Sequence, residues 1–246
     1  MGERWKWLLG RSENEAPAPA ASLVDRHVML LPAQGLAYLR VPKAANSSIR
    51  TRLAASYNLP MPEGIVPNKD RFWAEQDPSL VRSMTLAEFQ ALPERPRIWA
   101  FSFVRHPAMR LYSCWNNKLV ENGGSLSRAF VAMGVERGMD FHAFAECVAA
   151  HEDADCDLHV RSQVSVLVHD GIVVPDFVGK VETTQRDWAH VRYESRMRFG
   201  ADIGALPSKN MRLEVGLKPA DVMSAATHKV IRERYAEDYA RFYPRS

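Results

Sequence analysis

The stretch "LAYLRVPKAANSSIR", residues 36–50, decides the fold. Its first six residues form a short apolar run that predicts a buried strand over 36–41. Beyond it, Ile49, Leu53 and Tyr57 recur at helical spacing, which predicts a helix that begins near residue 46 or 47. The loop between strand and helix holds a lysine and two serines but no glycine. A strand that runs through a short loop into a helix is typical of α/β proteins.

A second unit of the same kind follows at residues 98–119. The run "IWAFSFV", residues 98–104, is almost unbrokenly apolar, as in a strand covered on both faces. Pro107 suits the first turn of a helix whose apolar stripe is Leu111, Trp115 and Leu119. Alternating strands and helices predict a three-layer α/β fold, with a central parallel sheet flanked by helices. Both loops then lie at the carboxyl edge of the sheet, where such folds bind ligands.

The remaining elements follow from local signals. Residues 58–82 hold several prolines and mixed charge, which predicts a long excursion over the surface. Further predicted elements are a helix opened by the capping box of Thr85 and Glu88, a helix capped by Asp140 and ending near Ala150, one or two strands at 165–182 with a turn at Asp170 and Gly171, a helix starting near Thr184 and Asp187, and a helical segment at 220–242.

The composition indicates an ordinary globular protein. The chain has 246 residues, 46% of them hydrophobic and 25% charged, and its formal charge of +3 gives no sign of a nucleic-acid partner. Residues 1–22 are predicted to be a disordered leader, and residues 23–246 a single domain. No stretch is apolar enough for a transmembrane segment, and the three cysteines have no metal-like spacing. We therefore expect a cytoplasmic protein with reduced thiols; the sequence makes no prediction of its oligomeric state.

The loop at residues 43–48 has two interpretations. A helix start offers unpaired N–H groups to an anion, Lys43 adds charge, and Ser47 and Ser48 add hydroxyls. Alternatively, Ser47 only caps the helix and Lys43 is a solvated loop residue. The glycines of the Walker pattern are absent, which argues against an ordinary ATPase or GTPase. The second loop favours the anion site, because Arg105 can donate two parallel hydrogen bonds to a phosphate and Ser113 can add a hydroxyl.

These stretches resemble the carbohydrate sulfotransferases, the Golgi-type family and its bacterial relatives. "VPKAANSS" is similar to the family's "PK-x-x-x-(S/T)-S" loop, and "FVRHPAMRLYS" to its "F-V-R-x-P-x-x-R-L-x-S" segment. Three further stretches match in the family's order: "DLHVRSQ", "DFVGKVETTQRDW" and "RERYAEDYARFYP". In the first of these, Ser162 stands where the family has proline. Together the matches cover roughly residues 36–243.

The resemblance implies a P-loop NTPase-like fold and 3′-phosphoadenosine-5′-phosphosulfate (PAPS) as sulfuryl donor, with no catalytic metal. It also implies two groups of donor-binding residues. For the 5′-phosphosulfate these are Lys43, Ala44, Ala45, Asn46, Ser47 and Ser48, and for the 3′-phosphate they are Arg105 and Ser113. The product is adenosine 3′,5′-bisphosphate, and the acceptor is a hydroxyl of a carbohydrate or glycoconjugate.

The acceptor side is predicted from fewer residues. His159 is the first candidate for the general base, with a purely structural histidine as the alternative, and Glu121 is the second candidate. Arg161 and Gln163 are candidates for binding an anionic sugar or another part of the acceptor. Two other functions stay open: a P-loop kinase, which would need Mg²⁺ and ATP, and a non-catalytic nucleotide-binding protein of the same fold.

Overall fold

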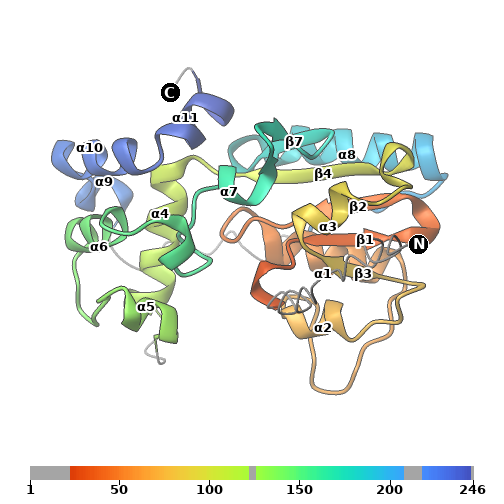
Figure 1. The fold of residues 1–246 in the computed structure, drawn as a ribbon, viewed down its shortest axis with the longest axis horizontal. Coiled ribbons are helices and arrows are strands. Elements are labelled where there is room, and N and C mark those ends of the chain that lie inside the picture. Colours follow the sequence, from red (N-terminus) through yellow and green to blue (C-terminus); the bar gives the residue numbers. More distant parts are fainter. Residues whose placement is uncertain (1–22, 122–125, 208–217, 245–246) are drawn as a thin grey trace, which may run out of the picture.

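The computed structural model describes residues 23–121, 126–207 and 218–244 (Figure 1). The predicted leader, residues 1–22, lies outside them. A sheet with its covering helices forms one half of the molecule, and a group of helices forms the other. Strand β4 (Trp99–Val104) runs from the sheet toward the helical half and continues there as helix α4 (Pro107–Trp115). The second strand-to-helix unit of the sequence therefore joins the two halves.

The central sheet has five strands in the order β3-β1-β2-β4-β7. Its strands are β1 (Val28–Leu31), β2 (Leu36–Leu39), β3 (Arg82–Met84), β4 and β7 (Phe177–Lys180). Strands β2, β4 and β7 are parallel, as predicted, whereas β1 is antiparallel to both of its neighbours. The sheet is therefore mixed, which corrects the prediction of a parallel sheet. The reason is the short 3₁₀ turn Pro32–Gln34, closed by Gly35 at φ 58°, because so short a connection can only join antiparallel strands.

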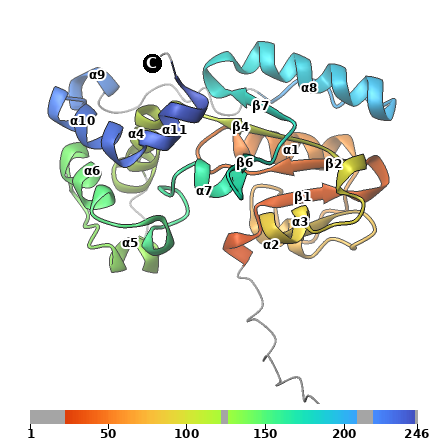
Figure 2. The ribbon, with the colours of Figure 1, turned by 45° about the horizontal axis from the view of Figure 1, so that its top comes forward.

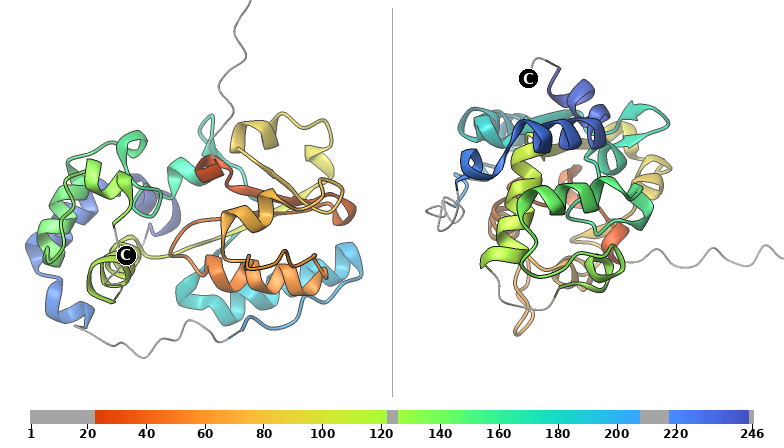
Figure 3. Two further views of the ribbon diagram at one scale, coloured as in Figure 1. Left: turned by 90° about the horizontal axis from the view of Figure 1, so that it is seen from below. Right: turned by 90° about the vertical axis from the view of Figure 1, so that its left-hand side faces the viewer.

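Helices cover both faces of this sheet (Figure 3, left). On one face α1 (Asn46–Ser56), α2 (Asp70–Ala74) and α8 (Thr184–Phe199) enclose a core built around Tyr38 and Phe101. On the other face α3 (Leu86–Gln90) contributes Phe89 to a core that continues into the helical half. Burial on both faces explains why β4 is apolar except at Ser102, whose hydroxyl donates to the Leu39 carbonyl at 2.7 Å.

The helical half contains α4 to α6 and the C-terminal helices (Figure 2). Its elements are α4, a π-helical turn at Asn116–Glu121, α5 (Arg128–Ala132), α6 (Phe141–Ala149), α9 (Pro219–Val222), α10 (Ala225–Arg234) and α11 (Ala236–Phe242). The other short elements are 3₁₀ turns at Leu23–Asp25, Arg95–Arg97, Asp153–Asp155 and Val181–Thr183, helix α7 (Val164–Leu167), and strands β5 (Val168–His169) and β6 (Ile172–Val173).

Local capping signals predicted helix starts correctly. The Thr85 hydroxyl accepts from the Glu88 N–H at 3.1 Å, and the Glu88 carboxylate accepts from the Thr85 N–H at 2.7 Å. The Asp140 carboxylate accepts from the Ala143 N–H at 2.8 Å at the start of α6. Both predictions held because a cap depends only on residues within one turn of the helix.

Predictions for the longer segments were only partly right. Residues 58–82 include α2, whose Phe72 and Trp73 are buried in the core, so this segment is not only a surface excursion. Residues 220–242 form three short helices in place of one. Residues 165–182 begin with α7, then form the small β5–β6 hairpin with the expected turn, and end in β7.

Two buried arginines hold α2 against the sheet. Arg40 and Arg50 are each 2% exposed or less, and both contact the carboxylate of Asp70, at 3.3 and 2.9 Å. Burial lowers the pKa of Arg50 to about 10, and Asp70 opposes that shift. Because a buried cation without a partner is costly, Asp70 is the counter-ion on which this part of the core depends.

We expect Asp70→Ala to lower the free energy of unfolding by about 2 kcal/mol. The cost is less than the 3–5 kcal/mol of a fully buried pair because the Asp70 side chain is 32% exposed and water can partly solvate the site. Chemical denaturation measures the change. The exposed Glu63 on the same segment is the control, since Glu63→Ala should stay within about 0.5 kcal/mol. Equal effects of the two substitutions would contradict this role for Asp70.

Candidate active site

Two loops leave the sheet side by side at its carboxyl edge. Strands β2 and β4 are parallel neighbours, and Leu39 pairs with Ser102. The chain leaves β2 through Pro42–Ala45 into α1, and leaves β4 through Arg105 and His106 into α4. Since neighbouring strands lie about 4.8 Å apart, the two loops begin next to one another.

The first loop adopts its shape without glycine. Lys43 has φ 67° and Ala45 has φ 57°, both in the left-handed region, whereas Ala44 between them does not. Alternation of this kind is typical of anion-binding loops, because it can turn backbone N–H groups toward one point. The Ala44 N–H is not one of these groups, because it donates to the Val41 carbonyl at 3.3 Å. A left-handed conformation costs a residue with a side chain roughly 1–2 kcal/mol. The loop therefore stores strain at its two left-handed residues.

Helix α1 begins directly after this loop with an open N-terminus. Ala45 is the N-cap residue, and no side chain caps the first turn. Ser47 is exposed and Ser48 is buried at this end of the helix. The side-chain oxygen of Asn46 accepts from the hydroxyl of Tyr38 at 3.4 Å, which ties the helix start to β2. The first-turn N–H groups and a serine hydroxyl thus share one end of the helix, which suits an anion.

The lysine of the loop is held by the second unit. The Lys43 ammonium donates to the side-chain oxygen of Asn117 at 3.1 Å. Asn117 lies in the π-helical turn that continues α4, a distortion frequent at functional sites. The Glu121 carboxylate accepts from Asn116 at 2.8 Å and from Asn117 at 3.4 Å. Glu121 therefore connects to Lys43 through Asn117, although the sequence places these residues far apart.

The buried side chain of Arg110 is bonded to the backbone of the lysine loop. Arg110 is 2% exposed; it donates from Nε to the Pro42 carbonyl at 2.9 Å and from Nη1 to the Arg161 carbonyl at 2.7 Å. It joins the lysine loop to the segment that follows His159. Arg110 was not predicted as a site residue. Its place in the quoted run "FVRHPAMRLYS" was the sequence signal that could have identified it.

The second loop presents a partly buried cation. Burial lowers the pKa of Arg105, and the charge of Glu182 opposes that shift. The guanidinium stays charged, because arginine is protonated far above neutral pH. Ser113 is half-buried on α4, on the helix that starts at this loop. The two neighbouring loops thus supply one lysine and one arginine to the same edge of the sheet.

His159 forms a pair with a buried carboxylate. One oxygen of Asp157 accepts from His159 Nδ1 at 2.8 Å and from the His159 backbone N–H at 2.9 Å; the other accepts from the Ser127 hydroxyl at 2.6 Å. Burial alone would raise the pKa of Asp157, but the bonds and charge from His159 and the Ser127 hydroxyl outweigh it and lower the pKa to about 2. An ionised Asp157 requires a donor at Nδ1, which leaves Nε2 of a neutral His159 able to accept a proton.

Several opposing effects act on the pKa of His159. Burial lowers its pKa, Asp157 opposes that shift, and the charges of Lys118 and Lys43 lower the pKa further. The influence of Lys43 links this histidine to the lysine loop. Asp157 was missed in the sequence analysis, although it stands only two residues before His159 in the quoted run "DLHVRSQ". Asn117 gave no sequence signal, since its contact with Lys43 arises only in the folded chain.

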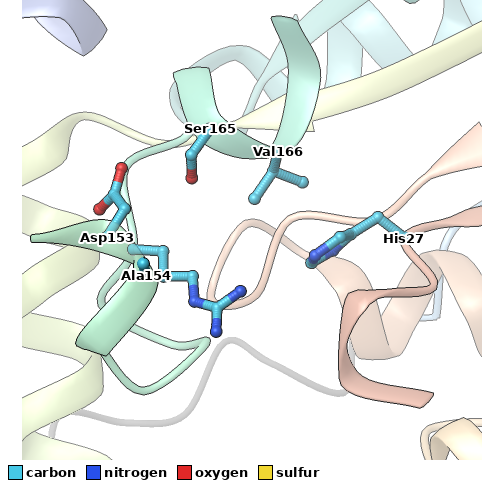
Figure 4. Close-up of a pocket in the computed structure, with 6 residues that line it drawn as sticks. His27, Asp153, Ala154, Ser165 and Val166 are labelled. Atoms are coloured by element: carbon cyan, nitrogen blue, oxygen red, sulfur yellow. The ribbon is translucent and has the colours of Figure 1, made fainter. Parts of the chain in front are cut away.

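The structure separates the other two acceptor candidates. Arg161 donates to Asp25 at 2.9 Å and to the Cys156 carbonyl at 3.1 Å. Its side chain lines a cavity of about 210 Å³, shown in Figure 4. The other lining residues are His27, Asp153, Ala154, Ser165 and Val166. Gln163, in contrast, is fully buried and bonded to the backbone of Arg105.

The described residues contain neither a metal-binding cluster nor a membrane-spanning helix. Within residues 23–121, 126–207 and 218–244, no group of three or more His, Cys, Asp or Glu side chains is placed to hold a metal ion. Nor does that part of the chain contain a helix that is both long and apolar enough to cross a membrane.

Comparison with known proteins gives one family. A model of the sulfotransferase family matches residues 26–244, which include both loops, the His159–Asp157 pair and the C-terminal helices. No curated protein and no solved structure matches the chain.

We expect Ala45→Gly to raise the free energy of unfolding by about 0.5 kcal/mol. Glycine relieves a left-handed cost of roughly 1–2 kcal/mol, which exceeds the 0.4–1 kcal/mol that it adds in unfolded-state entropy. Ala44→Gly is the matched control, because its φ is not left-handed and its buried methyl is lost. That variant should lose about 1–2 kcal/mol. Chemical denaturation of both distinguishes them, and the same loss in both would show that the loop is unstrained.

Proposed function

The chain belongs to the sulfotransferase family, and we propose that it transfers a sulfuryl group from PAPS to a hydroxyl of a carbohydrate or glycoconjugate. One observation supports the proposal: two loops, one with Lys43 and one with Arg105, start at the ends of adjacent parallel strands. A donor with phosphates at both ends of its ribose needs such a pair of sites. We assign residues 23–246 to a single domain of P-loop NTPase-like class, on the order β2, loop, α1.

The residues of the two loops fit the two ends of the donor. The backbone N–H groups of Ala45 and Asn46, with the hydroxyls of Ser47 and Ser48, would hold the 5′-phosphosulfate, and Lys43 would balance its charge. Ala44, also expected there, would only shape the loop, because it is buried and its N–H donates to the Val41 carbonyl. Arg105 and Ser113 would hold the 3′-phosphate, for which the planar guanidinium is well suited. Bound there, PAPS supplies an activated sulfuryl group.

The chain's residues then position the groups and stabilise charge. The acceptor oxygen forms the new S–O bond, and the S–O bond to the phosphate breaks and leaves its electron pair on the phosphate. Lys43 stabilises that leaving charge, and His159 takes the proton of the acceptor hydroxyl at Nε2. As in phosphoryl transfer, such a reaction needs alignment more than covalent help. His159 is preferred over Glu121 as the base, because two asparagine amides already occupy the Glu121 carboxylate.

The acceptor would extend into the cavity beside Arg161. Its lining places the polar side chains of Arg161 and Ser165 beside the apolar Ala154 and Val166, whereas the carboxylate of Asp153 is already bonded to Ser162 and Arg234. Hydroxyl groups both donate and accept hydrogen bonds, so a sugar ring matches this lining. Arg110 connects the cavity wall to the lysine loop through the carbonyls of Arg161 and Pro42. These contacts support a carbohydrate acceptor that reaches from the cavity toward Lys43.

Transfer of radiolabelled sulfate from PAPS to a panel of glycans tests the function. We expect Lys43→Ala to reduce turnover about 10²–10³-fold, the usual cost of removing one charge-stabilising donor, with unchanged folding by circular dichroism. Lys229→Ala is the control, since that lysine is 77% exposed on α10 and should leave turnover unchanged. A kinase would instead be stabilised by ATP with Mg²⁺ and show no sulfate transfer. Near-normal turnover of Lys43→Ala would rule out its assigned role.

The pH dependence of turnover tests His159. The base works only when neutral, and burial lowers its pKa below the ordinary value of about 6.5. Turnover should therefore hold at pH 7 and fall on the acid side, with a midpoint below 6.5. In Asp157→Asn the carboxylate no longer raises that pKa, so the midpoint should move to still lower pH while maximal turnover falls. A midpoint that stays in place in this variant would argue for another base.

A further inference from the structure

The side-chain amide of Gln163 forms hydrogen bonds with both backbone groups of Arg105. Its side-chain oxygen accepts from the Arg105 N–H at 2.9 Å, and its side-chain nitrogen donates to the Arg105 carbonyl at 2.9 Å. Strand β4 ends at Val104, so this two-point contact continues the hydrogen bonding of the sheet by one residue. The backbone that carries the guanidinium is thereby fixed in place.

Gln163 is in turn held by the C-terminal helix α11. Asp238 is fully buried; its carboxylate accepts from the backbone N–H groups of Gln163 and Val164 at 3.0 and 2.8 Å. It also accepts from the Gln163 side chain at 3.3 Å. A buried carboxylate is costly unless such bonds compensate it. Three donors around one carboxylate make this a rigid support.

Glu182, supported by Tyr243 of the C-terminal segment, holds the backbone of His106. One oxygen of Glu182 accepts from the His106 N–H at 2.7 Å, and the other accepts from the Tyr243 hydroxyl at 2.9 Å. The His106 ring also packs edge-on against Tyr239 and Tyr243. The backbone N–H groups of residues 105 and 106 are therefore both held by side chains that the C-terminal segment supports.

We propose that Gln163 and Glu182, supported by Asp238 and Tyr243, are positioning residues that aim Arg105 at the 3′-phosphate of the donor. The inference rests on the proposed function, in which Arg105 binds that phosphate. It gives Gln163 a role different from the acceptor contact expected from the sequence, because both ends of its amide are bonded to the protein. Misplacement of a charged donor by a fraction of an ångström weakens its bond, so support from behind is needed for specificity.

A purely structural role of these residues predicts a different pattern of nucleotide affinities. Loss of packing would weaken every ligand of the site by a similar factor, whereas loss of aim at Arg105 affects only ligands that carry the 3′-phosphate. The affinity ratio between adenosine 3′,5′-bisphosphate and adenosine 5′-monophosphate separates the two. Calorimetric titration of each variant with both nucleotides gives that ratio independently of stability.

The wild-type protein should prefer the bisphosphate by about ten- to a hundredfold, the scale of a charged hydrogen bond. Arg105→Ala should remove this preference. Gln163→Met, of similar shape but without the amide, should reduce it about three- to tenfold while leaving the monophosphate affinity within about twofold. Tyr243→Phe, which only removes the hydroxyl bond to Glu182, should reduce it by a smaller factor.

Tyr235→Phe is the matched control. Tyr235 is also buried near the C-terminus, and its hydroxyl donates to the Val160 carbonyl at 2.6 Å, outside the support of Arg105. Its variant should keep the wild-type ratio. An unchanged ratio in Gln163→Met, or an equal loss for both nucleotides, overturns the positioning role and leaves the proposed function standing. If Gln163→Met does not fold, the ratio in Tyr243→Phe decides in the same way. A wild-type protein without any preference overturns the assignment of Arg105 and the inference with it.

Discussion

The parallel pairing of β2 with β4 is the constraint on which the site depends. Leu39, the last residue of β2, lies opposite Ser102, and β4 ends shortly afterwards at Val104, so the two loops begin at the same edge. A shift of this register would separate Lys43 from Arg105, and a reversed strand would send one loop to the far edge. Packing on both faces holds the register, because every residue of both strands is buried.

The lysine loop adopts left-handed backbone at two residues without glycine. Left-handed backbone at Lys43 and Ala45 persists only where the surroundings impose it. Those surroundings are visible: Ala44 is buried, Arg110 holds the Pro42 carbonyl, and Asn46 is bonded to Tyr38.

Local signals in the sequence predicted much of the fold. The caps of α3 and α6, the buried strand β4 and the helix after Pro107 each depend on neighbouring residues, and each was found. Strand β3 was missed because its partner β1 is distant in the chain, whereas β1 was missed although it is the apolar run "VMLL" and a short turn joins it to β2. The same holds for the site. The sequence predicted two loops at the carboxyl edge of the sheet, but it could not indicate the contact of Lys43 with Asn117, which spans 74 residues.

The dependence of Arg105 on α11 has a consequence for the order in which the protein is completed. Ribosomes release the N-terminal parts of a chain first, and those parts begin to fold while synthesis continues. Strands β2 and β4 and both loops can therefore form before residues 236–243 exist. Only when Asp238 and Tyr243 dock do Gln163 and Glu182 gain their support. Under the proposed function, tight nucleotide binding would then require a finished chain, so ligand stabilisation would favour whole molecules over fragments in the cell.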